Sequence, residues 1–150
     1  MARIYVADDD PDVKAVVAYT LGDAGHEITT FSDGASVRAS TVADPPDLLV
    51  LDVMMPGLDG LQVLEFLRGW RFDAWVRVLI LTARASEQDW SRAFELGADR
   101  FMTKPFDPDE LTAAVGELLA FSPKELRERR DKEADRARLL YQLEDLFGEA

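Results

Sequence analysis

Short apolar runs alternate with longer segments of helical spacing along most of the chain. The apolar runs predict five β-strands, at residues 3–7, 27–31, 48–51, 76–81 and 101–103. Apolar positions at helical spacing predict a helix after each strand, at about residues 13–21, 35–43, 61–67, 86–96 and 108–121. This alternation is typical of a doubly wound α/β fold with a parallel sheet.

The residues after 121 have a different character. The sequence Ser122-Pro123-Lys124-Glu125 combines an N-cap, a proline in the first turn and a capping box, which together predict a helix start. We expect this extra C-terminal helix to run for about 25 residues to Phe147, with a charged middle. Its end carries an apolar stripe made of Leu139, Leu140, Leu143, Leu146 and Phe147. We therefore expect a domain at residues 1–121 and a helical extension at residues 122–150 that serves as a stalk, linker or dimerisation helix.

Composition narrows the classes of function. The 150 residues carry a net charge of -12, and residues 1–120 hold 10 Lys and Arg against 21 Asp and Glu. Such a surface repels phosphate backbones and anionic lipid, so we expect no direct binding to nucleic acid or membranes. The chain has no cysteine, which excludes disulfides and thiolate chemistry and agrees with a cytoplasmic location.

Chemically useful side chains stand where the predicted strands end. Asp8, Asp9 and Asp10 follow the first strand, Asp52 the third, Thr82 the fourth and Lys104 the fifth. Ligands of open α/β sheets bind at the carboxyl ends of the strands, so these groups are expected to converge. Clustered carboxylates suit a hard divalent cation, and a carboxylate, a hydroxyl and an ammonium suit phosphoryl transfer through an aspartyl phosphate. The nucleophile is then either in the first cluster or Asp52.

Four segments together resemble the receiver domain of two-component response regulators. They are residues 3–10, the run Asp52-Val53-Met54-Met55-Pro56-Gly57-Leu58-Asp59-Gly60, Leu81-Thr82-Ala83, and Lys104-Pro105-Phe106. The resemblance covers about 120 residues and implies the chemotaxis-regulator fold, a five-stranded parallel sheet of order 2-1-3-4-5.

The resemblance implies roles for the acidic residues. Asp52 is the implied phosphoacceptor and a ligand of Mg²⁺ or Mn²⁺. Asp9 is expected to bind the metal directly, Asp8 largely through water, and Met54 through its backbone carbonyl.

The resemblance also implies that Thr82 and Lys104 contact the phosphoryl oxygens and that the Lys104–Pro105 bond is cis. In the family a threonine and an aromatic residue form the output switch, and here these are Thr82 and Phe101. Met54 and Arg84 flank the path of the attacking water, and their bulk predicts a long-lived phosphoryl group.

The implied function is a signalling switch that a sensor histidine kinase or phosphotransfer protein phosphorylates, and that controls a partner or output domain. It catalyses only its own phosphorylation and dephosphorylation. The alternatives are a metal-dependent aspartyl-phosphate phosphatase and a degenerate receiver that only binds protein. A phosphatase would usually need an acid two residues after the nucleophile, where this chain has Met54. A flavin carrier is disfavoured because Asp8-Asp9-Asp10-Pro11 is the opposite of a phosphate-binding loop.

Aromatic residues suggest contact surfaces. Trp70, Phe72 and Trp75 crowd one predicted connection, and Trp90 lies on the predicted helix that receivers use for partner contact. We expect a homodimer through the C-terminal helix or the Trp90 face, although Trp90, Arg100 and Ala114 depart from the charge pairs of receivers that dimerise to drive DNA-binding domains.

Overall fold

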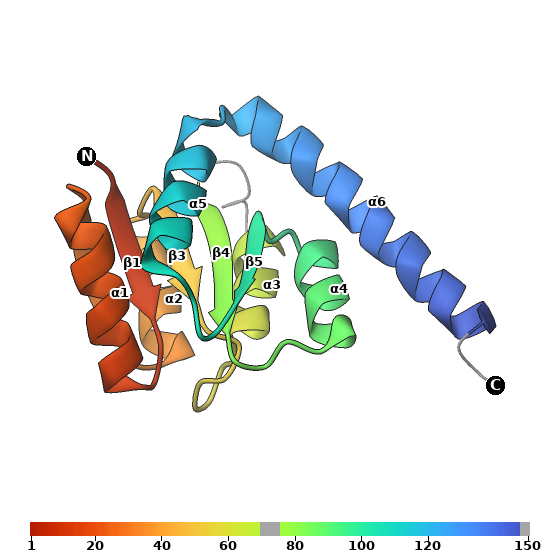
Figure 1. The fold of residues 1–150 in the computed structure, drawn as a ribbon, viewed down its shortest axis with the longest axis horizontal. Helices are drawn as coiled ribbons and strands as arrows, with labels where there is room; N and C mark the ends of the chain where they lie inside the picture. The colour runs from red at the N-terminus through yellow and green to blue at the C-terminus, as the bar shows by residue number, and fades with distance from the viewer. Residues whose placement is uncertain (70–75, 148–150) are drawn as a thin grey trace.

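The structure is a computed structural model of the whole chain, and it describes residues 1–69 and 76–147. Five parallel strands form a single sheet of order β2-β1-β3-β4-β5, as the resemblance implied (Figure 1). The strands are β1 (Arg3–Ala7), β2 (Glu27–Phe31), β3 (Leu48–Leu51), β4 (Arg77–Thr82) and β5 (Arg100–Thr103). The helices are α1 (Pro11–Asp23), α2 (Gly34–Ala43), α3 (Gly60–Gly69), α4 (Glu87–Glu95), α5 (Pro108–Ala120) and α6 (Pro123–Phe147).

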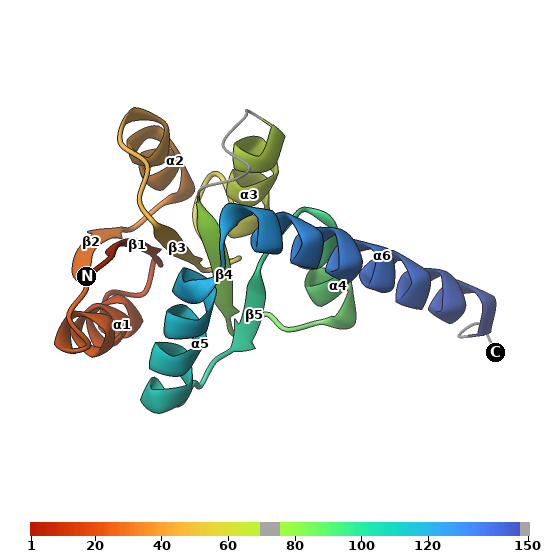
Figure 2. The ribbon, with the colours of Figure 1, turned by 90° about the horizontal axis from the view of Figure 1, so that it is seen from above.

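Helices cover both faces of the sheet. Buried residues of α1 and α5 form one apolar core, and buried residues of α2, α3 and α4 form the other, as the arrangement in Figure 2 shows. The central strand β3 is buried at every position because both of its faces are covered, which explains its continuous apolar sequence. On α1 only Val17 and Leu21 are buried, whereas Val16 and Tyr19 are exposed, since one narrow face of this helix meets the sheet.

The sequence located every element to within a few residues. The fourth strand is Arg77–Thr82 rather than 76–81, and the fifth begins at Arg100 rather than Phe101. Strand ends depend on pairing with neighbouring strands, which a single-strand pattern does not contain. The aromatic cluster Trp70, Phe72 and Trp75 lies outside the described residues.

The C-terminal helix α6 begins at the predicted capping box. Ser122 Oγ accepts the Glu125 N–H at 3.1 Å, and Glu125 Oε1 accepts the Ser122 N–H at 3.2 Å. The helix then crosses α4 and continues past the body of the domain (Figures 1 and 2). Leu126 and Ala137 on α6 are completely buried. The first part of α6 therefore folds back onto its own chain.

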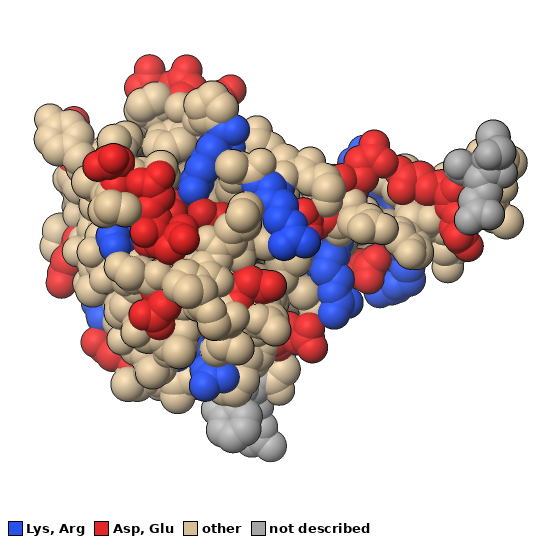
Figure 3. All heavy atoms as spheres, turned by 90° about the horizontal axis from the view of Figure 1, so that it is seen from below, with Lys and Arg blue, Asp and Glu red and all other residues tan. Residues whose placement is uncertain are grey.

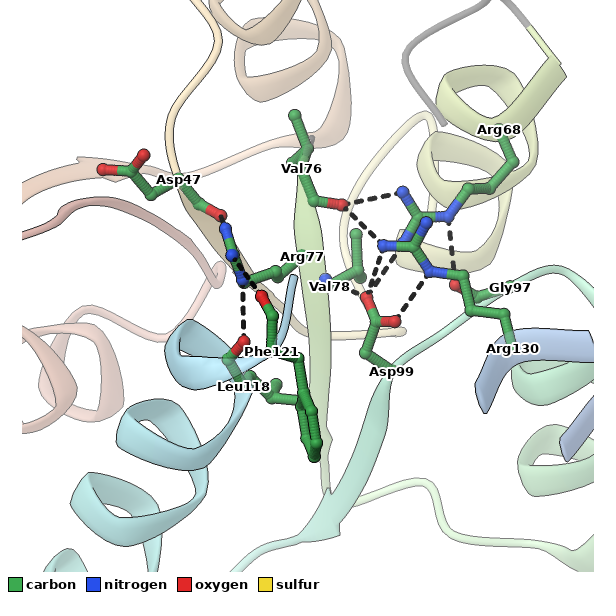
Figure 4. A network of polar contacts seen from close by, with 10 residues as sticks. All are labelled: Asp47, Arg68, Val76, Arg77, Val78, Gly97, Asp99, Leu118, Phe121 and Arg130. Atoms are coloured by element: carbon green, nitrogen blue, oxygen red, sulfur yellow. Dashed lines mark hydrogen bonds and ion pairs between the residues drawn. The ribbon is translucent and has the colours of Figure 1, made fainter. Parts of the chain in front are cut away.

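Two arginine clusters, a partly buried one at Arg77 and a buried one at Arg130, connect α6 and its junction with α5 to the domain (Figure 4). Arg77 donates to the carbonyl of Leu118 at 2.7 Å and to that of Phe121 at 2.8 Å, which ties the α5–α6 junction to β4. Arg130 of α6 forms the second cluster with Asp99.

The carboxylate of Asp99, just before β5, is the centre of the second cluster. It accepts from Arg130 Nε at 2.7 Å, from Arg68 at 3.0 Å and from the Val78 N–H at 2.8 Å (Figure 4). The side chains of Arg130 and Asp99 are only 8% and 1% exposed. The charged middle of α6 is therefore not exposed throughout, because Arg130 finds a buried carboxylate on a distant segment.

Candidate functional site

The strand register brings the first two acidic segments together. Ala7 of β1 pairs with Leu51 of β3, so the residues that follow them, Asp8 and Asp52, leave the sheet side by side. The loops after β1, β3, β4 and β5 all lie at the same end of the sheet (Figure 1). Asp8 and Asp52 are 3% and 5% exposed.

Lys104 joins the two carboxylates. Its Nζ lies 2.7 Å from Asp8 Oδ2 and 2.7 Å from Asp52 Oδ2. The Lys104–Pro105 bond is cis, as expected. Burial alone would lower the pKa of Lys104, but the bonds to Asp52 and Asp8 outweigh it and raise that pKa. Burial, together with the neighbouring charge of Asp52, raises the pKa of Asp8 despite the bond from Lys104.

The acidic residues fit a divalent cation. One carboxylate oxygen from each of Asp8, Asp9 and Asp52 lies within 4.8 Å of the others. Asp9 is exposed while the other two are buried, so one side of the group faces solvent. Mg²⁺ prefers oxygen ligands and retains waters, and a half-open set of carboxylates suits it. Asp10 has another role, because it caps α1 by accepting the N–H groups of Asp12 and Val13.

The loop after β3 is shaped around Asp52. The Met54 N–H donates to Asp52 Oδ1 at 3.0 Å, which orients the carboxylate. Asp59 and Gln62 exchange hydrogen bonds at the start of α3, so Asp59 caps this helix. A Cβ on Gly60 would lie 2.2 Å from the Asp52 carbonyl oxygen, so only glycine fits there.

Thr82 lies at the end of β4 and is completely buried. Its Oγ1 accepts the Arg84 N–H at 3.1 Å. Phe101 on β5 is half-buried and packs against the core that α3 and α4 cover. The Arg84 side chain pairs with Asp89 of α4, Nε to Oδ2 at 3.0 Å. Asp89 is not among the predicted site residues, although the spacing Ser86-x-x-Asp89 matches the cap of α4, in which Ser86 Oγ accepts the Asp89 N–H.

This end of the molecule is acidic. Figure 3 looks onto it and shows acidic side chains gathered over the domain. Within residues 1–69 and 76–147, no helix combines the length and hydropathy needed to cross a membrane.

Comparison with known proteins places this geometry in a family. The family model described as "Response regulator receiver domain" matches residues 4–116. The chain belongs to the response regulator receiver family. The sheet order and the acidic group of Asp8, Asp9 and Asp52 are thus features of a receiver, and the resemblance inferred from four short segments is confirmed.

Curated relatives of this receiver are transcriptional regulators. It is 40% identical over 117 residues to the alkaline phosphatase synthesis transcriptional regulatory protein PhoP of Bacillus subtilis, covering 78% of this chain and 48% of that protein. It is 41% identical over 119 residues to the DNA-binding dual master transcriptional regulator RpaA of Synechocystis, covering 79% of this chain and 49% of that protein. The chain therefore spans about half the length of these relatives.

Solved structures agree on the fold. A response regulator from Chloroflexus aurantiacus matches with a TM-score of 0.76 at 30% identity, over 80% of this chain and 98% of the other. The BeF3-activated DrrB receiver domain matches with a TM-score of 0.72 at 30% identity, over 81% and 99% of the two chains. These matches cover about four fifths of this chain.

Proposed function

We propose that this receiver is a phosphorylation-controlled switch and that Asp52 is its phosphoacceptor. The observation that carries the proposal is the position of the Lys104 ammonium, 2.7 Å from both Asp8 and Asp52, beside a third carboxylate from Asp9. The donor is a sensor histidine kinase or a phosphotransfer protein. A carboxylate oxygen of Asp52 attacks phosphorus, the phosphorus–nitrogen bond of the phosphohistidine breaks, and its electron pair returns to the imidazole.

The surrounding residues act on the charge of the phosphoryl group. Lys104 moves its hydrogen bond from the Asp52 carboxylate to a phosphoryl oxygen, and Thr82 donates its hydroxyl to another. Mg²⁺ or Mn²⁺, when bound, supplies positive charge that offsets the charge on these oxygens. Asp9 and Asp52 would hold that cation directly and Asp8 largely through water, and Met54 would offer its backbone carbonyl.

The response follows from Thr82 and Phe101. When the Thr82 hydroxyl turns toward the phosphoryl group, it vacates space beside β5, and the Phe101 ring turns inward. A phenylalanine has no hydroxyl to tether the inward state, so packing alone stabilises it. The switch controls a partner or output domain and catalyses only its own phosphorylation and dephosphorylation. It works in the cytoplasm and does not itself bind nucleic acid, since the net charge of -12 repels phosphate.

Intact-mass spectrometry after incubation with acetyl phosphate and Mg²⁺ tests the acceptor. We expect the mass of one phosphoryl group, which chelation of the metal prevents and Asp52→Asn abolishes. Asp10→Asn is the matched control, because Asp10 is a carboxylate of the same region that caps α1. Loss of labelling in both variants, or in neither, would reject Asp52 as the acceptor. No labelling of the wild type under any condition would make the chain a degenerate receiver.

A second proposal concerns the lifetime of the phosphoryl group. Met54 is 54% exposed two residues after the acceptor, and the Arg84 side chain, two residues after Thr82, is held by Asp89. The receiver resemblance puts both positions beside the path of the attacking water. The double variant Met54→Asn, Arg84→Glu should lose its phosphoryl group faster than the wild type. Equal half-lives, followed by intact mass after removal of acetyl phosphate, would reject this role.

A further inference from the structure

The helix α6 has two parts that differ in how they are held. Residues 123–138 are anchored by the buried side chains of Leu126, Arg130 and Ala137. Arg130 makes two hydrogen bonds to the Asp99 carboxylate, at 2.7 and 3.0 Å. This part is fixed to the domain.

Residues 139–147, which we call the distal arm, contain no buried residue. Its large apolar side chains are 38–78% exposed, and the set comprises Leu139, Leu140, Tyr141, Leu143, Leu146 and Phe147. The arm extends beyond the body of the domain (Figures 1 and 3). An exposed apolar segment joined to an anchored one can leave the domain at low cost, because few apolar contacts are lost.

A groove lies between α4 and the arm. Leu140, Leu143 and Phe147 of the arm and Trp90 of α4 line this groove. Glu87 of α4 and Glu144 of the arm also line it. The two like charges oppose docking, since the hydrogen bond and charge of Glu87 raise the pKa of Glu144. Apolar contact with Trp90 must outweigh this repulsion for the arm to stay docked.

Trp90 also borders the switch. A second cavity, on the β5 side of α4, is lined by Trp90, Phe101, Met102 and Pro105. The Trp90 ring is half-buried and meets Phe94 edge to face, with ring centroids 5.0 Å apart. One side chain therefore forms a wall of the cavity beside Phe101 and a wall of the groove under the arm.

We propose that Trp90 transmits the phosphorylation state of Asp52 to α6, and that the distal arm is docked in the unphosphorylated protein and released in the phosphorylated one. When Phe101 turns inward, the cavity beside it widens and Trp90 moves into it. The groove then loses its apolar wall, while the repulsion between Glu87 and Glu144 remains. This inference rests on the proposed phosphorylation switch and assigns it an output element within the chain.

Thermodynamic linkage adds a second consequence. If phosphorylation releases the arm, release of the arm must favour the phosphorylated form by the same factor. A variant that weakens docking should therefore shift the switch toward its active state, and a variant that strengthens docking should shift it back. Trp90→Ala removes the apolar wall, whereas Glu87→Gln removes the repulsion.

Pulsed electron paramagnetic resonance can measure the position of the arm relative to the domain. Because the chain has no native cysteine, spin labels attach only at the cysteines introduced for the experiment. Spin labels at Ala113→Cys on α5 and Asp145→Cys on α6 report their separation, and both positions are exposed. We expect one narrow distance distribution without phosphoryl donor. With acetyl phosphate and Mg²⁺ we expect most molecules to move to a longer, broader distribution, and intact mass of the same sample gives the phosphorylated fraction.

Variants separate this inference from the switch itself. Trp90→Ala and Leu143→Ser should give the broad distance distribution even without phosphorylation. In Glu87→Gln, part of the phosphorylated protein should keep the narrow distance distribution of the docked arm. Leu146→Ala is the control, because Leu146 lies on the arm, is 74% exposed and lines neither the groove nor the cavity beside Phe101. A phosphorylated sample with an unchanged narrow distribution would overturn the role of Trp90 and leave the switch intact. Absence of the phosphoryl mass would instead reject the proposed switch, and this inference with it.

Discussion

Arg130→Ala tests whether a buried ion pair fastens α6 to the domain. The change removes hydrogen bonds to Asp99 at 2.7 and 3.0 Å and one to the Val76 carbonyl at 3.3 Å. Breaking a buried pair commonly costs about 3–5 kcal/mol because a charge is left uncompensated. Here Asp99 keeps its bonds from Arg68 and the Val78 N–H, so the loss should be smaller, about 2–3 kcal/mol.

Two further substitutions separate the contribution of the buried ion pair to stability from that of side-chain packing and from that of an exposed ion pair. Arg130→Met keeps most of the apolar stem and should still lose much of this stability if the ion pair matters more than packing. Arg138→Ala is the matched control on the same helix. Its partner is Asp135, and the two side chains are 58% and 75% exposed, so we expect a loss of about 0.5 kcal/mol or less.

Urea denaturation, followed by circular dichroism, measures the difference in the free energy of unfolding between each variant and the wild type. For a chain of this size, about 2–3 kcal/mol corresponds to a fall in Tm of roughly 4–12 °C. An unchanged m-value would show that the helix still unfolds with the domain, whereas a separate early transition would show that α6 detaches first. If Arg130→Ala matched Arg138→Ala in midpoint and m-value, the buried pair would not be what holds α6.

Three other predictions address different parts of the molecule. Gly60→Ala should destabilise the domain and sharply reduce phosphoryl labelling at Asp52, because the new Cβ would lie 2.2 Å from the Asp52 carbonyl oxygen. A variant that melts at the same temperature as the wild type would contradict this. The pKa of Glu144 is raised by Glu87, so docking of the distal arm should strengthen as pH falls through that pKa and weaken as pH rises. Spin-label distances should show this trend in the wild type and lose it in Glu87→Gln. Arg77→Ala should accelerate amide exchange around residues 118–126, as its bonds to two carbonyls of the α5–α6 junction are lost; unchanged exchange there would refute that role.

Local pattern accounts for most of the fold. Every strand and helix was found within a few residues of its predicted place, because apolar periodicity and capping residues act over short distances. The N-terminal cap of α6 is one example, since Ser122 and Glu125 form it between themselves. The convergence of Asp8, Asp52 and Lys104 followed from topology, as parallel strands place their carboxyl ends at one edge.

Other features have no local signal. The requirement for glycine at position 60 comes from the approach of the Asp52 backbone. Likewise, Arg68 meets Asp99, 31 residues away in sequence, only because α3 packs beside the segment before β5. In both cases the partner is known only once two elements have packed.

The sequence by itself determined the order of the elements, the chemistry at the strand ends and the presence of a long terminal helix, because each depends on neighbouring residues. Only the tertiary structure decided where that helix lies. Arg130 belongs to a run of charges that looks solvated, yet it is buried against Asp99, 31 residues away in sequence. Long-range pairing of charges depends on which surfaces meet, and that is a property of the packed molecule.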